Sequence, residues 1–162
     1  MDDDNFDFNF EDLTPEENEA LEKEMRERQQ RIKKHPLKLK GDEIFETVSA
    51  LMETFNEDEK DMYGGTLMES AMIICAKIAG ALGSENWHIC MQNAAIIREH
   101  AEHLRIANHG LKEFTETDKN YIKVLRTTME EFQQVFKEWV ATFKNLEDDG
   151  YEDEWGLFIR EK

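Results

Sequence analysis

The chain has 162 residues, of which 40% are hydrophobic and 35% are charged, and its formal net charge is −17. This length and composition are typical of one domain with a full core and a charged surface, and a second domain is not expected. The negative charge argues against direct binding to nucleic acid, where a basic surface must displace the counterions of the phosphates, and against binding to anionic membranes. A basic protein surface, or simple solubility, suits it better.

The first 13 residues are acidic and carry phenylalanines at alternate positions, Phe6, Phe8 and Phe10. The segment is too polar and too short to fold alone. Two interpretations therefore stay open for it. It is either a disordered leader or a peptide that docks its aromatic side chains on a partner or on its own domain.

Residues 14–34 are predicted to form a helix, because Thr14 and Glu17 match a capping box and Pro15 suits the first turn. Acidic residues near the start and basic residues near the end complement the helix dipole. The apolar content is thin, namely Leu21, Met25 and Ile32. Such a helix buries little, so we predict that residues 1–36 form an acidic leader and a peripheral helix that extends into solvent or binds a partner.

No proline occurs after Pro36, and four amphipathic segments of helical length follow. The breaks between them are short and rich in Gly, Ser, Thr, Asn and Asp. This pattern predicts an all-α fold, with an antiparallel, up-down four-helix bundle over residues 37–146.

The first two helices of this bundle are expected at about residues 42–55 and from Asn56 onward, where Asn56 and Glu59 match a second capping box. Two glycines, Gly64 and Gly65, lie early in the second helix, where each lowers helix stability by roughly 1 kcal/mol relative to alanine. They indicate either a late helix start or kink, or a position where another helix or subunit comes very close.

The third helix is predicted to start at a Ser84 cap and to carry a regular heptad of apolar and small residues. The heptad runs through Trp87, Cys90, Ala94, Ile97, Ala101, Leu104, Asn108 and Leu111. Beside this seam, His100 and His103 share a helix face with Glu99, a spacing that would suit two or three ligands of a transition metal. Because the register places the histidines at the edge of the seam, ordinary surface histidines are the favoured interpretation, and no metal or cofactor is expected.

The fourth helix is expected to start at Thr115 or Thr117 and to carry the widest aromatic stripe of the chain. The stripe contains Tyr121, Val124, Leu125, Thr128, Phe132, Val135, Phe136, Trp139, Val140 and Phe143. Residues 147–162 then form an acidic tail with 7 acidic and 2 basic residues. Its aromatic side chains, Trp155 and Phe158 among them, are not needed for solubility, so they either pack back on the helices or bind a partner.

The layout from about Lys40 to Phe143 resembles the four-helix-bundle proteins related to the 23S rRNA intervening-sequence protein. The resemblance lies in the helix lengths, in Tyr63-Gly64 early in the second helix, and in the small residues Ala76 and Ala79-Gly80 near its end. It implies a small bacterial bundle that tends to oligomerise, and some members are accessory proteins to a reverse transcriptase and bind nucleic acid. No functional residue carries over, because family members have arginines where this chain has residues 68–71.

The compartment is predicted from the cysteines and the N-terminus. Cys75 and Cys90 fall in apolar stripes and are expected to be free buried thiols of a reducing compartment. The acidic start of the chain is the reverse of a secretory signal, which begins with basic residues. The longest apolar-rich stretch, residues 71–82, contains Lys77 and is too short to span a bilayer. We therefore expect a cytoplasmic protein.

Catalytic motifs are absent from the sequence, which contains no phosphate-binding glycine loop, no His-Glu-x-x-His and no Cys-x-x-Cys. We therefore predict a non-enzymatic protein–protein interaction or structural protein, whose partner is another protein or a further copy of the chain. The acidic flanks would supply the partner-binding anchors Phe6, Phe8, Phe10, Trp155 and Phe158. Two alternatives stay open: a metal-binding bundle or enzyme that uses the histidines of the third helix, and an accessory protein to a nucleic-acid enzyme.

Overall fold

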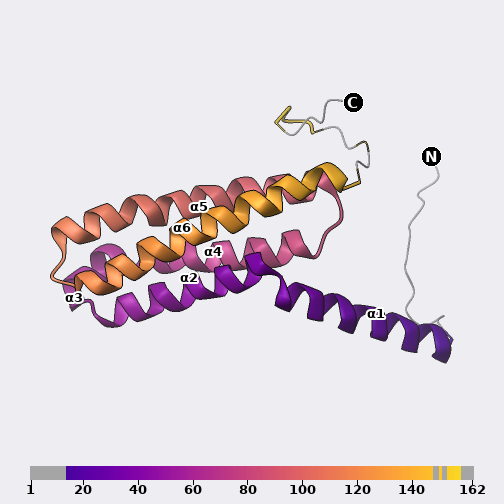
Figure 1. The fold of residues 1–162 in the computed structure, drawn as a ribbon, viewed down its shortest axis with the longest axis horizontal. Coiled ribbons are helices and arrows are strands. Elements are labelled where there is room, and N and C mark those ends of the chain that lie inside the picture. The colour runs from indigo at the N-terminus through magenta and orange to yellow at the C-terminus, as the bar shows by residue number, and fades with distance from the viewer. Residues whose placement is uncertain (1–13, 148–149, 151–152, 158–162) are drawn as a thin grey trace. The chain divides into compact units, whose positions relative to one another are not determined.

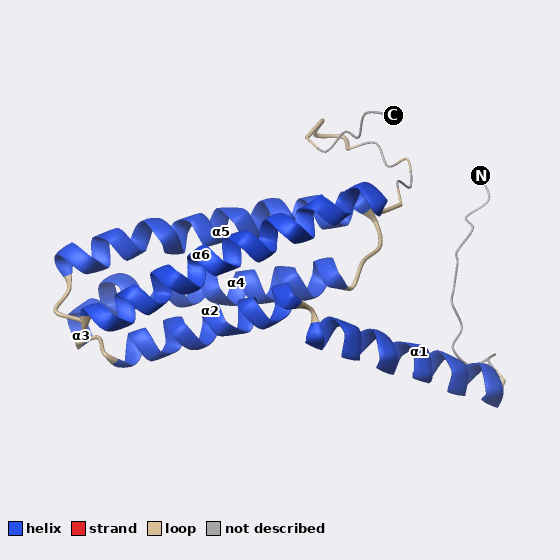
Figure 2. Ribbon diagram, in the orientation of Figure 1, coloured by secondary structure: helices blue, strands red, loops and turns tan. Residues whose placement is uncertain are grey.

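The computed structural model describes residues 14–147, 150 and 153–157. Within them the secondary structure is helical apart from one isolated bridge between Asn86 and Glu147, which confirms the all-α prediction (Figure 2). The chain divides into two compact units, residues 1–31 and residues 32–162.

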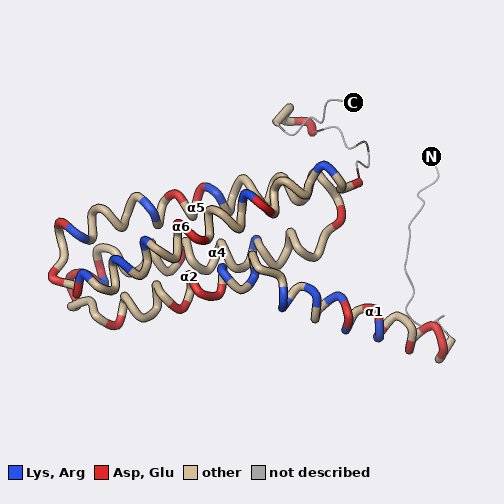
Figure 3. The backbone as a smooth tube through the Cα atoms, viewed as in Figure 1, with Lys and Arg blue, Asp and Glu red and all other residues tan. Residues whose placement is uncertain are grey.

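Helix α1 spans Pro15–Lys34 and has the predicted capping box. Thr14 Oγ1 accepts a hydrogen bond from Glu17 N at 3.3 Å, and Glu17 Oε2 accepts one from Thr14 N at 2.8 Å. The bond from Thr14 N, and a second that Glu17 Oε2 accepts from Thr14 Oγ1 at 2.8 Å, lower the pKa of the Glu17 carboxyl. Acidic residues gather toward the start of α1 and basic ones toward its end (Figure 3). No residue of α1 is buried, so local interactions rather than a core stabilise this helix.

Helix α2 spans Pro36–Glu53, so it begins at Pro36 rather than at the expected Asp42. The reason is a cap that the periodicity does not reveal: His35 Nδ1 accepts a hydrogen bond from Leu37 N at 3.2 Å. Pro36 then occupies the first helical position, where no N–H is needed. Burial lowers the pKa of His35, which favours the neutral ring that can accept this bond. The additional turn places Leu37 in the core.

Three helical segments follow without a break: α3 (Glu57–Glu59), a π-helical turn (Lys60–Gly64) and α4 (Gly65–Leu82). The capping box predicted at Asn56 is confirmed, since Glu59 N donates to Asn56 Oδ1 at 2.8 Å and Asn56 N donates to Glu59 Oε2 at 3.1 Å. Glu59 also accepts a hydrogen bond from the backbone N of Glu116 at 2.8 Å. One carboxylate thus links the start of this helical run to the loop between α5 and α6.

The run Glu57–Leu82 is long and apolar enough, by length and composition, to cross a membrane, and no other helix in the described part of the chain is. The apolar stretch considered from the sequence, residues 71–82, is shorter because it leaves out residues 57–70 of this helical run. The core helix of a soluble protein meets the same criterion, and α4 packs against both α2 and α5.

Helix α5 spans Trp87–Phe114, and its cap is Asn86 rather than Ser84. Asn86 Oδ1 accepts a hydrogen bond from Ile89 N at 3.0 Å, while Ser84 Oγ accepts one from Asn86 N. The predicted heptad is buried at six positions: Cys90, Ala94, Ile97, Leu104, Asn108 and Leu111. Its two other positions, Trp87 and Ala101, are half-buried.

Helix α6 spans Lys119–Ala141 and is followed by a 3₁₀ turn, Thr142–Asn145. Its cap is Asp118 rather than Thr115 or Thr117, because the Asp118 side chain accepts a hydrogen bond from Asn120 N at 2.8 Å. Eight of the ten positions of the predicted stripe are buried or half-buried. Tyr121 and Val124 are exposed, whereas Ile122 and Met129 are buried in their place.

Helices α2, α4, α5 and α6 lie alongside one another (Figure 1), and their buried side chains form one hydrophobic core. Helix α4 contacts α2 and α5, and α6 contacts α2 and α5, so each helix has two neighbours. The contact between α4 and α5 is the most extensive of the four, and the contact between α5 and α6 is the least extensive. A gap in the side-chain packing is therefore expected first between α5 and α6.

Candidate functional site

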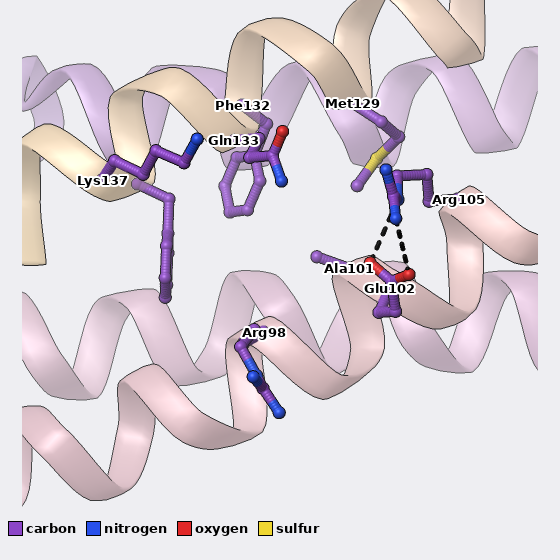
Figure 4. A pocket seen from close by; sticks show the side chains of 9 residues that line it. Arg98, Ala101, Glu102, Arg105, Met129, Phe132, Gln133 and Lys137 are labelled. Atoms are coloured by element: carbon purple, nitrogen blue, oxygen red, sulfur yellow. Dashed lines mark hydrogen bonds and ion pairs between the residues drawn. The ribbon is translucent and has the colours of Figure 1, made fainter.

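A groove with a volume of about 230 Å³ lies between α5 and α6 (Figure 4). We call it the α5–α6 groove. Helix α5 contributes Arg98, Ala101, Glu102 and Arg105, and α6 contributes Met129, Phe132, Gln133, Phe136 and Lys137. The lining contains no serine, threonine, cysteine or histidine, so it offers no hydroxyl or thiol nucleophile of these types and no histidine base.

The floor of the groove is apolar. Phe132 and Met129 are buried, and Phe136 is half-buried. The rings of Phe132 and Phe136 lie 6.1 Å apart, and the series continues along α6 with Phe136 and Trp139, whose rings meet edge to face at 5.7 Å. The aromatic stripe predicted for this helix thus supplies the floor of the groove. An aromatic floor favours a large apolar side chain in a ligand.

The rim of the groove is cationic. Arg105 binds Glu102 through two hydrogen bonds, Nε to Oε2 at 3.0 Å and Nη2 to Oε1 at 2.8 Å. This bidentate pair lowers the pKa of Glu102 and raises that of Arg105, and the charge of Arg98 lowers the pKa of Glu102 further. Within the described residues, neither Arg98 nor Lys137 has a carboxylate within 4.0 Å.

Three cations and one anion therefore surround an apolar floor, on a chain whose formal net charge is −17. The sequence carries a signal for this arrangement in the spacing of two arginines, which was not among the predicted sites. Arg98 and Arg105 are seven residues apart, so they occupy the same heptad position beside the α5 seam. The groove suits a ligand that combines a carboxylate with an aromatic or aliphatic side chain.

The two histidines of the proposed metal site connect α5 to α4. Ser70 of α4 is only 2% exposed, and its Oγ lies 3.1 Å from His100 Nδ1 and 2.7 Å from His103 Nδ1. A hydroxyl has one proton, so Ser70 donates to one ring nitrogen and accepts from the other. The register of α5 alone predicted surface histidines and did not reveal Ser70. Because Ser70 is buried, the cluster is suited to joining two helices rather than to attacking a substrate.

Glu99 is exposed and has no hydrogen bond to this cluster. Among the described residues, no group of three or more His, Cys, Asp or Glu side chains could hold a metal ion. Both cysteines, Cys75 and Cys90, are free thiols, and burial raises the pKa of each. A raised pKa leaves little reactive thiolate at neutral pH.

The two glycines proposed for close packing differ in their surroundings. A Cβ at Gly64 would lie 3.0 Å from Met52 Cε of α2, whereas a Cβ at Gly65 would have open space around it. The tightest approach is at Gly41 of α2, where a Cβ would lie 2.7 Å from Ile78 Cδ1 of α4. Gly41 was not predicted to pack closely, because the first helix of the bundle was expected to begin one residue later, at Asp42.

Of the proposed partner-binding aromatics, the structure describes Trp155 alone. Phe6, Phe8, Phe10 and Phe158 lie outside the described residues. The side chain of Trp155 is 87% exposed, and Leu157 beside it is 74% exposed. Both belong to a short turn after α6 that is held by the carboxylate of Asp153.

Comparisons of the chain with protein-family models, with curated proteins and with solved structures found no match. The resemblance to the proteins related to the 23S rRNA intervening-sequence protein therefore stays a prediction.

Proposed function

We propose that this chain is a non-enzymatic protein–protein interaction protein, and that its α5–α6 groove binds an acidic peptide segment that carries a large apolar side chain. The observation that carries the proposal is the combination of a Phe132–Phe136 floor with two cations, Arg98 and Lys137, that lack a carboxylate partner among the described residues. An unpaired cation beside an apolar surface is available to a ligand carboxylate, and the pair gains strength where water is partly excluded.

The proposal includes an architecture: α2, α4, α5 and α6 form an antiparallel, up-down four-helix bundle, and α1 is an additional N-terminal helix. Each helix of this set contacts two others, which supports a ring of four. Such a bundle provides a rigid scaffold, so a groove between two of its helices is formed before the ligand arrives. The proposal also places the protein in the cytoplasm, where free thiols persist, and counts a further copy of the chain among its partners.

The acidic balance of the whole chain supports a peptide rather than a nucleic acid as the ligand. The groove has a surplus of two positive charges, and a run of phosphates would meet acidic residues beyond it. The groove also lacks serine, threonine, cysteine and histidine side chains, which supports binding rather than catalysis.

The direct test is selection of a phage-displayed random peptide library on the full-length protein. We expect the selected peptides to share Asp or Glu next to Trp, Phe or Leu, because these side chains match the rim and the floor. Binding of a selected peptide, measured by fluorescence anisotropy, is expected to weaken at least about tenfold in R98E/K137E, which reverses both unpaired cations.

The matched control is K112E/K123E, which makes the same charge change on the same two helices outside the groove. Binding in this control is expected to stay within about twofold of the wild type, because exposed charges at this distance are screened. Peptides without acidic residues, or equal losses in the two double variants, would contradict the proposal. Salt-sensitive binding of single-stranded RNA in the groove would favour a nucleic-acid accessory protein instead.

A further inference from the structure

We infer that the α5–α6 groove is the docking site of this chain's own C-terminal turn, residues 153–157, with Trp155 on the apolar floor and Glu154 beside Arg98 and Lys137. The inference rests on the proposed function, since it names an occupant of the same groove. Docking would place Trp155, the most exposed large hydrophobic side chain of the described residues, against the apolar floor.

The turn has a defined local structure before any docking. Asp153 Oδ1 accepts a hydrogen bond from Trp155 N at 3.1 Å, and Oδ2 accepts one from Leu157 N at 2.7 Å. Gly156 N donates to the carbonyl of Asp153 at 2.8 Å, and Gly156 has a φ of 66°, which glycine adopts without strain. Trp155 and Leu157 are therefore presented together on a small structured unit, which reduces the entropy lost on binding.

The charges of the two surfaces are complementary. The tail from Glu147 to Lys162 has 7 acidic and 2 basic residues, whereas the groove has three cations and one anion. Asp153 uses its carboxylate to hold the turn, which leaves the neighbouring Glu154 as the carboxylate to approach the rim. The groove is thus locally cationic on a protein that is acidic overall, and the tail carries both acidic and apolar side chains.

The length of the tail allows the turn to reach the groove of the same molecule. Glu147 is fixed at the start of α5, because its carbonyl accepts a hydrogen bond from Trp87 N at 3.0 Å. Arg98 lies about 17 Å along the helix from Trp87, at about 1.5 Å per residue. The chain from Glu147 to Asp153, where the turn begins, advances six residues and spans up to about 20 Å when extended. The near end of the groove, at Arg98 and Lys137, is within this reach.

The test uses the full-length protein labelled with 5-fluorotryptophan. ¹⁹F NMR resolves the three tryptophans, and the W155F variant assigns the Trp155 signal by its loss. A soluble paramagnetic agent then measures how accessible each indole is. We expect the paramagnetic relaxation of Trp155 to be about fivefold weaker in the wild type than in R98E/K137E, because the docked state excludes the agent.

Two further variants make the result specific. The K112E/K123E control, with the same charge change outside the groove, is expected to keep Trp155 protected as in the wild type. The triple variant R98E/K137E/E154R is expected to restore most of the protection, because the charges of the pair are exchanged. Equal accessibility of Trp155 in the wild type and in R98E/K137E would overturn the inference, as would protection that the triple variant does not restore.

Dilution distinguishes the source of the tail. Protection that is independent of concentration, with a constant mass by light scattering, supports docking within one molecule. Protection that disappears on dilution together with an oligomeric mass would assign the groove to the tail of a second copy and overturn the intramolecular inference.

Failure of this inference and failure of the proposed function have different signatures. If selected peptides bind and depend on Arg98 and Lys137 while Trp155 stays accessible, the function holds and the inference fails. If Trp155 is protected but neither the wild type nor W155A selects peptides, the inference holds and the groove serves only its own tail.

Discussion

Helix α5 packs differently against its two neighbours. On the α4 side, Ser70 reaches His100 and His103 across an extensive contact. On the α6 side the contact is the smallest of the four helix pairs, and large side chains such as Phe132 and Phe136 line it. The distance between two packed helices depends on the side chains at their contact, so small residues bring α4 close while aromatic residues leave a groove beside α6.

The difference also appears where α4 meets α2. Gly41 lets Ile78 approach so closely that no Cβ would fit without a shift, and Cys75 Sγ donates a hydrogen bond to the Gly41 carbonyl at 3.3 Å. The interfaces of α4 thus depend on small residues and interhelical polar contacts. The α5–α6 interface has one buried polar contact of this kind, from Asn108 Nδ2 to the carbonyl of Ile122 at 2.8 Å. Along the groove it depends on aromatic residues, and two of them, Phe132 and Phe136, also form the floor of the candidate binding site. Close packing gives stability, whereas incomplete packing leaves a surface that a ligand can complete.

The strongest test of this comparison is F132A, which removes a buried aromatic side chain from the open interface. We expect the free energy of unfolding to fall by about 3–5 kcal/mol, because the cavity adds to the lost burial. Denaturant titration followed by circular dichroism measures the change. In the control V124A, at an exposed position of the same helix, the change is expected to be less than about 0.5 kcal/mol. Similar losses in the two variants would show that the aromatic floor does not hold α6 in place.

A smaller effect is expected at the close contact between α2 and α4. In G41A, the added methyl is expected to displace the fully buried Ile78, at a cost of about 1–3 kcal/mol, while alanine returns about 1 kcal/mol of helix propensity. The net expectation is a loss of about 1 kcal/mol in the free energy of unfolding.

The matched control for this variant is G65A, where a Cβ has open space. It is expected to raise stability by up to about 1 kcal/mol. A stabilised G41A would mean that α2 and α4 separate easily, and the contrast between tight and open interfaces would weaken.

The smallest effect is expected at the His35 cap of α2, the helix that contains Gly41. The pKa of His35 is lower in the folded state than in the unfolded chain, so the unfolded chain binds more protons at acidic pH. The stability contributed by the neutral ring is full above the unfolded pKa of about 6.5 and falls as the pH decreases below it. We expect a loss below about 1 kcal/mol, since the ring is partly exposed.

The variant H35N supplies a cap that does not titrate in this range. Its stability is expected to match the wild type at pH 8 and to exceed it at pH 5, as measured by urea titration at both values. Parallel pH profiles for H35N and the wild type would show that His35 does not control the start of α2.

Local sequence patterns were sufficient for the all-α class, for most helix positions and for two capping boxes, at Thr14 and Asn56. These features depend on residues within a turn or two of one another, so spacing and residue type reveal them. The aromatic stripe of α6 was visible for the same reason. The caps at Asn86 and Asp118 were missed because several capping residues lie close together in each loop, and loop closure selects among them.

The tertiary structure alone decided which helices meet closely and which leave a groove. The contact of Gly41 with Ile78, the hydrogen bonds of Ser70 to two histidines and the bond of Glu59 to the backbone of Glu116 all join residues far apart in sequence. The α5–α6 groove has the same origin, since its floor comes from one helix and two of its cations from another. Periodicity identifies the face that a helix buries, but the sizes of the side chains on both partners set the distance between their axes.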